Sequence, residues 1–408
     1  MVNVRGWVYS SMVDVIIAGA GPTGLLASLA LAKIGVLTAI ADPILRLDVD
    51  PVPQKKHQSR TTAHLPEAVE FLKELGVWEA VAPRACPLNG LEIYNAPSPR
   101  RARTGFSKTS FNPRDLQEEN FGYNISVSDS TSTMLGMIKN NPNIKILANT
   151  KISNIIHNNN SIRAIFDSGK EIDCKLLIGA DGANSSVKKL ANIKDFTINT
   201  QQTAISFHVK HDRPHGYISN EIYTEGGPFT TIPLRDSQER SSAIVWMCKT
   251  EELLDFKRLG MGQLVQQIER ASQGVLGKIL SVSDLDEYPI FIQIARQLVG
   301  KRIVLIGEAA HLLPPIGAQG FNQSVRDVMI LRNLVSKSNL DLGSDRLLQK
   351  YQKQRFPDVM ARAGVVGILN YLAWTNSAPL RILRSEGLKI LKHNSQLRKL
   401  MMEMGLTK

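Results

Sequence analysis

The stretch that decides the fold lies near the N-terminus, where residues 13–42 read VDVIIAGAGPTGLLASLALAKIGVLTAIAD. Val13–Ala18 and Val36–Ala41 are mostly apolar, as strands buried on both faces of a parallel sheet are. Pro22–Ile34, which lies between them, predicts a helix. Charged residues and glycines interrupt the run, which argues against a signal peptide or a membrane span. We therefore predict a β-α-β unit and an α/β fold.

The turn between the first strand and the helix carries the pattern GxGxxG. Gly19 would permit the tight turn, Gly21 would let the backbone approach a pyrophosphate, and Gly24 would let the helix pack close to the strand. Pro22 opens the helix, whose N-terminus offers N–H groups and the positive end of its dipole to phosphates. Asp42 closes the second strand, where an acid would bind the adenosine ribose. The spacing predicts a dinucleotide site.

Two later apolar runs end in the same way. Leu176–Ile178 leads into Gly179-Ala-Asp181-Gly182, and Arg302–Ile306 leads into Gly307-Glu308. Ligands of open α/β sheets bind at the carboxyl ends of strands, so three such ends predict a long cofactor spread across the sheet. The turn at Gly317–Asn322 then opens a helix, and its N–H groups would stabilise negative charge on a flavin ring.

The composition excludes several protein classes. Apolar residues make up 43% and charged residues 21% of the 408 residues, and the mean hydropathy is −0.10. These values exclude disordered, fibrous and multi-span membrane chains, and the length predicts two or three domains. The net charge of +12 comes without a zinc finger or a basic run, so we expect no nucleic-acid partner. Cys86, Cys174 and Cys248 form no CxxC, which favours buried thiols in a reducing compartment.

Four histidines are candidate functional groups. His208, His211 and His215 have a metal-like spacing, but Pro214 prevents a helix through them, and we predict a strand and loop with no metal site. His311 follows the third strand end and is either a proton-transfer group or a group that fixes the cofactor loop. The sequence assigns no catalytic residue.

The segments GAGPTG, LLIGADGANSSVKK and GEAAHLLPPIGAQGFNQSVRD, in this order, resemble the class A flavoprotein monooxygenases. Arg60-Thr-Thr-Ala and Leu75-Gly-Val-Trp78 are similar to segments of the ubiquinone-biosynthesis hydroxylases (UbiH-type) within that class. The resemblance covers about residues 12–406. It implies a Rossmann-like FAD-binding domain of the glutathione-reductase type, an inserted, mainly β substrate domain and a C-terminal helical region.

The resemblance implies non-covalent FAD and a transient visit by NAD(P)H, in line with the lack of a second GxGxxG after a strand. It also implies that Arg60 contacts the ribose-phosphate part of FAD. Four positions depart from the family pattern: Glu308 for aspartate, Lys188 for arginine, and Ala318 and Ser324 for glycine. The positions that we assign to the cofactor are Gly19, Gly21, Pro22, Gly24, Asp42, Arg60, Asp181, Gly182, Gly307, Glu308, Gly317, Gln319, Gly320 and Asn322.

The implied function is hydroxylation of an aromatic ring with NAD(P)H and O₂, on a polyprenyl-phenol intermediate of ubiquinone biosynthesis. Two alternatives stay open: a hydroxylase of a small soluble aromatic, and a flavin-binding subunit without turnover in a biosynthetic complex. We expect a cofactor domain over residues 12–84, 127–188 and 287–340, a substrate domain over 85–126 and 189–286, and helices over 341–408.

The C-terminal segment bears on where the protein works, which we expect to be the cytoplasm. Residues 378–408 contain seven Lys or Arg against two acids, with Leu and Met at helical spacing. The segment is either an amphipathic helix packed on its own domain, or a peripheral dock. A dock would meet the inner face of the membrane or partner enzymes of a ubiquinone-biosynthesis complex.

Overall fold

The first sheet is built around the N-terminal stretch. In the computed structural model, which describes residues 12–45, 59–95, 107–224, 226–338, 340–374 and 378–406, it has eight strands. Five are parallel, in the order β19 (Ile303–Leu305), β11 (Glu171–Gly179), β1 (Met12–Ala18), β2 (Thr38–Asp42) and β8 (Ile144–Ala148). Antiparallel β18 (Val299–Gly300), β9 (Ile152–His157) and β10 (Ile162–Phe166) complete it.

The carboxyl ends of the central strands are level with one another. Ala18 at the end of β1 is paired with Ala41 on one side and with Gly179 on the other, and Gly179 is paired with Leu305. The parallel core and the strand ends predicted from the three apolar runs are thus confirmed. Everything that follows these strands in sequence meets at one edge of the sheet.

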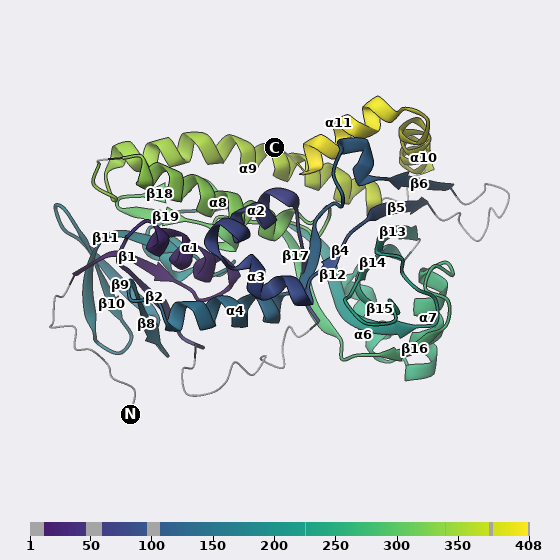
Figure 1. The fold of residues 1–408 in the computed structure, drawn as a ribbon, viewed down its shortest axis with the longest axis horizontal. Helices are drawn as coiled ribbons and strands as arrows, with labels where there is room; N and C mark the ends of the chain where they lie inside the picture. The colour runs from purple at the N-terminus through teal and green to yellow at the C-terminus, as the bar shows by residue number, and fades with distance from the viewer. Residues whose placement is uncertain are drawn as a thin grey trace.

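Helix α1 (Pro22–Lys33) explains the unbroken apolar run. Its residues from Gly24 to Ala32 are all buried, because α4 (Val127–Lys139) and α8 (Gln319–Ser336) flank it and the sheet lies beneath it. Figure 1 shows these helices beside the first sheet. The shorter helices on this side are α2 (Pro66–Leu75), α3 (Trp78–Val81) and α5 (Ser186–Leu190). Elsewhere along the chain, 3₁₀ turns lie at Ala82–Arg84, Pro113–Leu116, Thr250–Glu252 and Gly307–Ala309.

The second sheet has nine strands and is mostly antiparallel. Its order is β20 (His311–Leu312), β17 (Asp286–Ala295), β12 (Asp195–His211), β15 (Ser241–Lys249), β14 (Gly227–Pro233), β13 (Ile218–Thr224), β5 (Gly90–Asn95) and β6 (Ser107–Phe111), with β16 (Ile279–Val282) paired to β12. Helices α6 (Leu253–Lys257) and α7 (Met261–Ala271) lie on this side of the molecule (Figure 1). Phe207, Ile244 and Ile268 belong to the core under α7.

A small third sheet joins β3 (Thr61–His64), β7 (Tyr123–Ser126) and β4 (Cys86–Pro87).

The strands of the first sheet come from residues 12–42, 144–179 and 299–305, so the first sheet is discontinuous in sequence. The predicted boundary at 287 would assign most of β17 to the cofactor domain, but hydrogen bonds to β12 place β17 in the second sheet.

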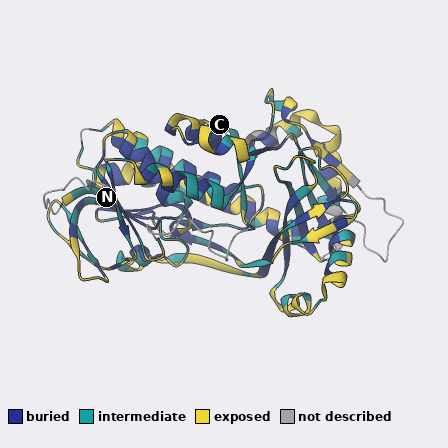
Figure 2. Cartoon of the chain, turned by 60° about the horizontal axis from the view of Figure 1, so that its bottom comes forward, coloured by how far each residue is buried: buried dark blue, intermediate teal, exposed yellow. Residues whose placement is uncertain are grey.

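The C-terminal region is helical, with α9 (Asp345–Trp374), α10 (Ala378–His393) and α11 (Ser395–Leu406). Leu388, Leu391 and Met402 are buried in one cluster with Phe111 and Phe121. These three side chains of α10 and α11 therefore pack on their own chain, whereas Ile390 is 54% and Leu397 37% exposed, and Figure 2 shows exposed residues on the outer side of both helices. Within the described residues, no helix combines the length and the hydropathy needed to cross a bilayer.

Candidate cofactor site

The three glycines of the GxGxxG loop divide into two roles. A β-carbon on Gly19, whose φ is +101°, would collide with the carbonyl oxygen of Ala180, and one on Gly24 would collide with that of Gly19. A β-carbon on Gly21 would meet no described atom within 4 Å. Gly19 and Gly24 are therefore required by packing, whereas Gly21 borders open space that a side chain would fill.

The open space at Gly21 faces the start of α1. Pro22 takes the first helical position, no described side chain caps this helix, and its first turn carries no acid. Such an uncapped N-terminus leaves N–H groups and the positive dipole end for an anion. The loop therefore fits the pyrophosphate of a dinucleotide.

The three motifs meet at this point. The N–H of Ala180 donates to the carbonyl of Ala18 at 2.8 Å, so the Asp181-Gly182 loop leaves the sheet beside the glycine loop. A β-carbon on Gly307 would lie 2.8 Å from Oγ1 of Thr23 in the first turn of α1. Segments far apart in sequence thus surround one helix terminus, as the three strand ends predicted.

Asp42 stands at the predicted strand end and organises the backbone around it. Its Oδ2 accepts from the N–H of Ala20 at 2.8 Å, and its Oδ1 accepts from the N–H groups of Ile44 and Leu45 at 2.8 and 3.1 Å. The carboxylate therefore connects the glycine loop to the turn after β2. Its contact with a ribose stays a prediction.

Asp181 serves its own loop. Its carboxylate accepts from the hydroxyl of Ser185 at 2.5 Å and from the N–H and hydroxyl of Ser186 at 2.7 and 2.8 Å, at the start of α5. The neighbouring Gly182 has a φ of +78° and no described atom near its Cα on the side-chain side. Backbone at Gly182, rather than the Asp181 side chain, is therefore the part of this motif open to a cofactor.

Lys188, which departs from the family pattern, has a structural partner. Its side chain is 4% exposed, and Nζ lies 2.9 Å from Oδ2 of Asp195 at the start of β12. The pair ties the Asp181-Gly182 loop to the second sheet. A single ammonium suffices for this contact, so the missing guanidinium does not weaken the loop.

Arg60 and Glu308 come from separate segments and lie together. Nη2 of Arg60 is 3.6 Å from Oε1 of Glu308, and both side chains are more than 40% exposed. The guanidinium also lies over the ring of Tyr288, 4.9 Å from its centroid. An exposed cation and an exposed carboxylate beside the glycine loop are suited to the phosphate and hydroxyl groups of one ligand.

The start of α8 is a second uncapped helix terminus. No described side chain caps it, its first turn carries no acid, and a β-carbon on Gly320 would meet no described atom within 4 Å. Gly317 and Ala318 both have positive φ, +63° and +56°. Ala318 therefore holds a left-handed conformation at the position where the family often has glycine, which strains the backbone.

Gln319 and Asn322 hold this turn from within. Oδ1 of Asn322 accepts from the N–H of Leu65 at 3.0 Å, and Nδ2 donates to the carbonyls of Ala63 and Ala318 at 2.8 and 2.6 Å. Nε2 of Gln319 donates to the carbonyl of Gly317 at 3.0 Å. These side chains face the protein, so any contact that the turn makes with a flavin would come from its backbone.

Beneath the two loops lies a buried charged network that the sequence analysis missed. Oδ2 of Asp327 accepts from the N–H of Gly307 at 2.8 Å and from Nε2 of His311 at 2.7 Å, and Oδ1 accepts from Nε of Arg355 at 2.8 Å. Asp327 and Arg355 are 0% exposed. Burial alone would raise the pKa of Asp327, but His311 and Arg355 outweigh it and the pKa lies below its usual value.

This network bears on the two roles proposed for His311. The imidazole is buried and bonded to Asp327, and its Nδ1 contacts no described hydrogen-bonding group. The structure therefore favours the role of fixing the cofactor loop. The burial of Arg355 could have been predicted from helical spacing, because Arg355 lies four residues from both Tyr351 and Val359 on the buried side of α9.

An apolar cluster lies on the face of the second sheet opposite α7. It joins strand residues to Ile316, which directly precedes the Gly317 turn, and to helix α9; its buried members are Ala204, Met247, Ile290, Ile316 and Val366. Strand alternation puts Val245 and Met247 on this face and Ile244 and Trp246 on the other. The cluster is thus a packed apolar core that adjoins the cofactor turn, and we call it the apolar wall.

A polar pair borders the same face. On β13, Glu221 and Tyr223 flank Ile222, which belongs to the core under α7. The hydroxyl of Tyr223 donates to Oε1 of Glu221 at 2.8 Å, and burial raises the pKa of that carboxyl. Arg384 lies over the Tyr223 ring at 4.8 Å.

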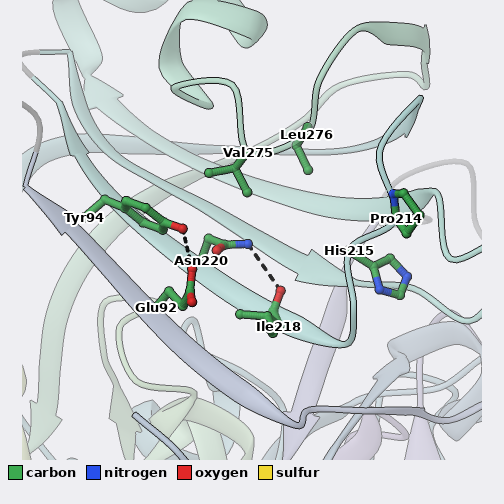
Figure 3. A pocket seen from close by; sticks show the side chains of 8 residues that line it. All are labelled: Glu92, Tyr94, Pro214, His215, Ile218, Asn220, Val275 and Leu276. Carbon is green, nitrogen blue, oxygen red and sulfur yellow. Dashed lines mark hydrogen bonds between the residues drawn. The ribbon is translucent and has the colours of Figure 1, made fainter. Parts of the chain in front are cut away.

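The histidine-rich segment makes ordinary structural bonds. His208 bonds the carbonyl of Ser59 at 3.0 Å, and His211 bonds the hydroxyl of Ser242 at 2.9 Å. His215 borders a small hollow of about 120 Å³ with Glu92, Tyr94 and Asn220 (Figure 3). None of the motif residues lines this hollow, so it is separate from the cofactor site.

The three cysteines are buried as free thiols, as predicted. Burial raises the pKa of Cys86 and of Cys174 to about 12 and that of Cys248 to about 11.

Comparison with known proteins shows the family of this chain. Residues 12–363 match the family model described as FAD binding domain. The chain is 26% identical over 392 residues to ubiquinone hydroxylase UbiL of Rhodospirillum rubrum, covering 95% of this chain and 88% of that protein. It is 24% identical to 3-demethoxyubiquinol 3-hydroxylase of Escherichia coli, covering 92% and 93%. The crystal structure of p-nitrophenol 4-monooxygenase PnpA from Pseudomonas putida superposes with a TM-score of 0.77 at 17% identity, covering 97% and 98%.

Proposed function

We propose that this chain, which belongs to the FAD binding domain family and is an FAD-dependent monooxygenase, hydroxylates the phenolic ring of a prenylated ubiquinone precursor. Two relatives, UbiL and the 3-demethoxyubiquinol 3-hydroxylase, are named as hydroxylases of ubiquinone or a ubiquinol precursor. Each aligns with more than nine-tenths of this chain. The observation that carries the substrate proposal is the apolar wall of Ala204, Met247, Ile290, Ile316 and Val366 beside the cofactor turn. Such a wall suits an aromatic ring with a hydrocarbon chain.

The residues around the glycine loop form a cradle that would hold FAD, and FAD would supply the redox chemistry by which electrons from NAD(P)H and O₂ yield a ring hydroxyl and water. Gly21 leaves room for the pyrophosphate, and the α1 terminus and Arg60 offset its charge. The uncapped start of α8 offers N–H groups and a positive dipole end that would stabilise negative charge on a reduced flavin ring bound there.

The remaining residues orient the reactants and exclude water. The Asp327 network fixes the Gly307 and His311 loops from below, so the cradle keeps its shape without relying on exposed side chains. The apolar wall keeps water from the reacting atoms, which prevents loss of oxygen as hydrogen peroxide. Glu221 and Tyr223, partly or wholly buried at the edge of this face, are suited to hydrogen-bond a phenolic hydroxyl.

The deciding experiment is metabolite analysis of a strain that lacks this gene. We expect an incompletely hydroxylated prenylphenol to accumulate and the intact gene to clear it. A Gly21→Val allele, whose product should fold without FAD, should fail to clear it. A strain that makes quinone normally, or that accumulates a soluble aromatic instead, would refute the substrate proposal.

We also infer that the enzyme contacts a membrane surface or a partner enzyme. A polyprenyl chain does not dissolve in water, so the substrate must arrive from lipid or from a carrier. Helices α10 and α11 still present exposed Lys389 and Lys392, but their buried Leu388, Leu391 and Met402 are occupied by their own chain. These buried side chains support the interpretation of a segment packed on its own domain, while the exposed Ile390 and Leu397 leave docking through the same segment a prediction.

A further inference from the structure

Helix α9 has two different sides. It runs along the outer edge of the molecule beside α8 (Figure 1), and its 30 residues extend about 45 Å at 1.5 Å per residue. One side is buried at three- and four-residue spacing from Leu348 to Ala373. The opposite side faces outward, and its chemistry changes halfway along the helix.

The outer side of the C-terminal half is apolar and exposed. Met360 is 44%, Val365 47%, Ile368 62% and Tyr371 63% exposed. The sequence has no charged residue from 363 to 380. Single exposed apolar residues are common, but a continuous apolar face of this kind marks a surface that meets a partner.

The outer side of the N-terminal half is cationic. Arg346, Lys350 and Lys353 are exposed there, and residues 346–357 include no acid. Eighteen residues make five helical turns, so Lys350 lies in line with Ile368, and Lys353 with Tyr371. The same side of one helix therefore carries cations and then apolar groups, while the acids of α9 are Asp345 at its start and Asp358, which pairs with Arg355 and Arg362.

The C-terminal half of α9 also borders the apolar wall. Val366, on its inner side, packs with Ile316 of the cofactor turn, and Trp374 packs so closely on β14 that a β-carbon on Gly227 would collide with its indole. The helix thus separates the apolar wall from whatever meets its outer side. An apolar substrate that leaves a lipid phase would reach the wall beside this helix.

We propose that the outer face of α9 docks on an anionic lipid bilayer, with Lys350 and Lys353 against the headgroups and Ile368 and Tyr371, about 27 Å farther along the helix, inserted at the acyl boundary. The inference rests on the proposed prenylated substrate. A bilayer is the occupant because cations without acids complement anionic headgroups, while the apolar residues enter the acyl boundary. The charges and the apolar side chains contribute to one binding event.

The test is flotation of the FAD-loaded protein with vesicles of mixed phosphatidylglycerol and phosphatidylcholine. The wild type should bind these vesicles and not phosphatidylcholine alone. Lys350→Glu with Lys353→Glu should weaken binding about a hundredfold, and Ile368→Gln about tenfold. The matched control is Lys389→Glu with Lys392→Glu on α10, which makes the same charge change and should leave binding unchanged.

Two further measurements separate the possible failures. Equal binding by wild type and α9 variants, or no binding by any protein, overturns the docking proposal. A second copy of the chain as the occupant would appear as a dimer by light scattering that Ile368→Gln dissociates, and this result also overturns it. Hydroxylation of a short-chain, water-soluble phenol should be equal in wild type and α9 variants; its absence in wild type refutes the proposed function and leaves the docking result standing.

Discussion

Replacing Arg355 with methionine should destabilise the fold more than any other single removal of a charge on α9. Arg355 and Asp327 are both 0% exposed, and the 2.8 Å bond between them is one of those that Asp327 accepts. The variant leaves the buried carboxylate without a guanidinium, with His311, the N–H of Gly307 and the Tyr351 hydroxyl as its remaining partners. Breaking a buried pair in this way costs about 3–5 kcal/mol. That loss lowers the ratio of folded to unfolded protein by roughly a hundredfold to several thousandfold.

The assay is urea unfolding followed by circular dichroism, with FAD content measured on the same samples. Arg362→Met is the matched control, because Arg362 pairs with Asp358, which keeps Arg355 as a partner and is 33% exposed. The control should lose clearly less than the about 3–5 kcal/mol expected for Arg355→Met, because it leaves no buried carboxylate without a cation. Arg355→Met should also lose FAD, since Asp327 holds the N–H of Gly307. Equal losses for the two variants would show that Asp327 does not depend on Arg355 for its buried charge.

Four further outcomes are expected. Gly21→Val should fold but lose FAD, whereas Gly24→Val should not fold, because only the second β-carbon collides with backbone; circular dichroism and flavin absorbance separate the two, and a yellow Gly21→Val protein would contradict the cradle. Ala318→Gly should raise the free energy of unfolding by about 1 kcal/mol in urea, by relieving a φ of +56°, and no gain would mean that the turn is unstrained. Burial lowers the pKa of His64 from 6.5 to about 4, so only the unfolded chain binds its proton between these values. The free energy of unfolding should therefore be highest above pH 6.5 and fall by about 3 kcal/mol toward pH 4. His64→Phe should reduce this pH dependence, as measured by thermal melting at several pH values. Glu308→Asp should keep FAD and Glu308→Leu should weaken it by about 1 kcal/mol in a fluorescence titration, unless the carboxylate points away from the cofactor.

Local patterns in the sequence were enough to predict the cofactor half of the fold. The apolar runs before Gly19, Gly179 and Gly307 became buried strands because a segment without polar side chains is stable only between two layers. Glycine spacing then placed the turns, since the backbone conformation at Gly19 and the close approach at Gly24 exclude any side chain. These constraints involve only a few neighbouring residues, so they can be recognised without knowledge of the rest of the chain.

The direction in which each polar side chain points could not be predicted from these local patterns. Asp181 and Asn322 stand in the predicted motifs, yet their oxygens accept bonds from the protein's own backbone and hydroxyl groups. Whether a carboxylate or an amide faces a ligand or its own loop depends on which donors the fold brings within about 3 Å. Residue identity fixes the chemistry available, and the neighbours decide where it is used.

The β-α-β unit, the three strand ends and the family of the cofactor site could therefore be predicted from short segments of the chain. The tertiary structure alone decided that Arg355 partners Asp327 across two helices, that α10 and α11 cover their own domain, and that α9 keeps an exposed apolar side. Each of these depends on contacts between segments tens to hundreds of residues apart. Helical periodicity shows that a side will be apolar, but only the packing of the other elements settles whether that side is covered.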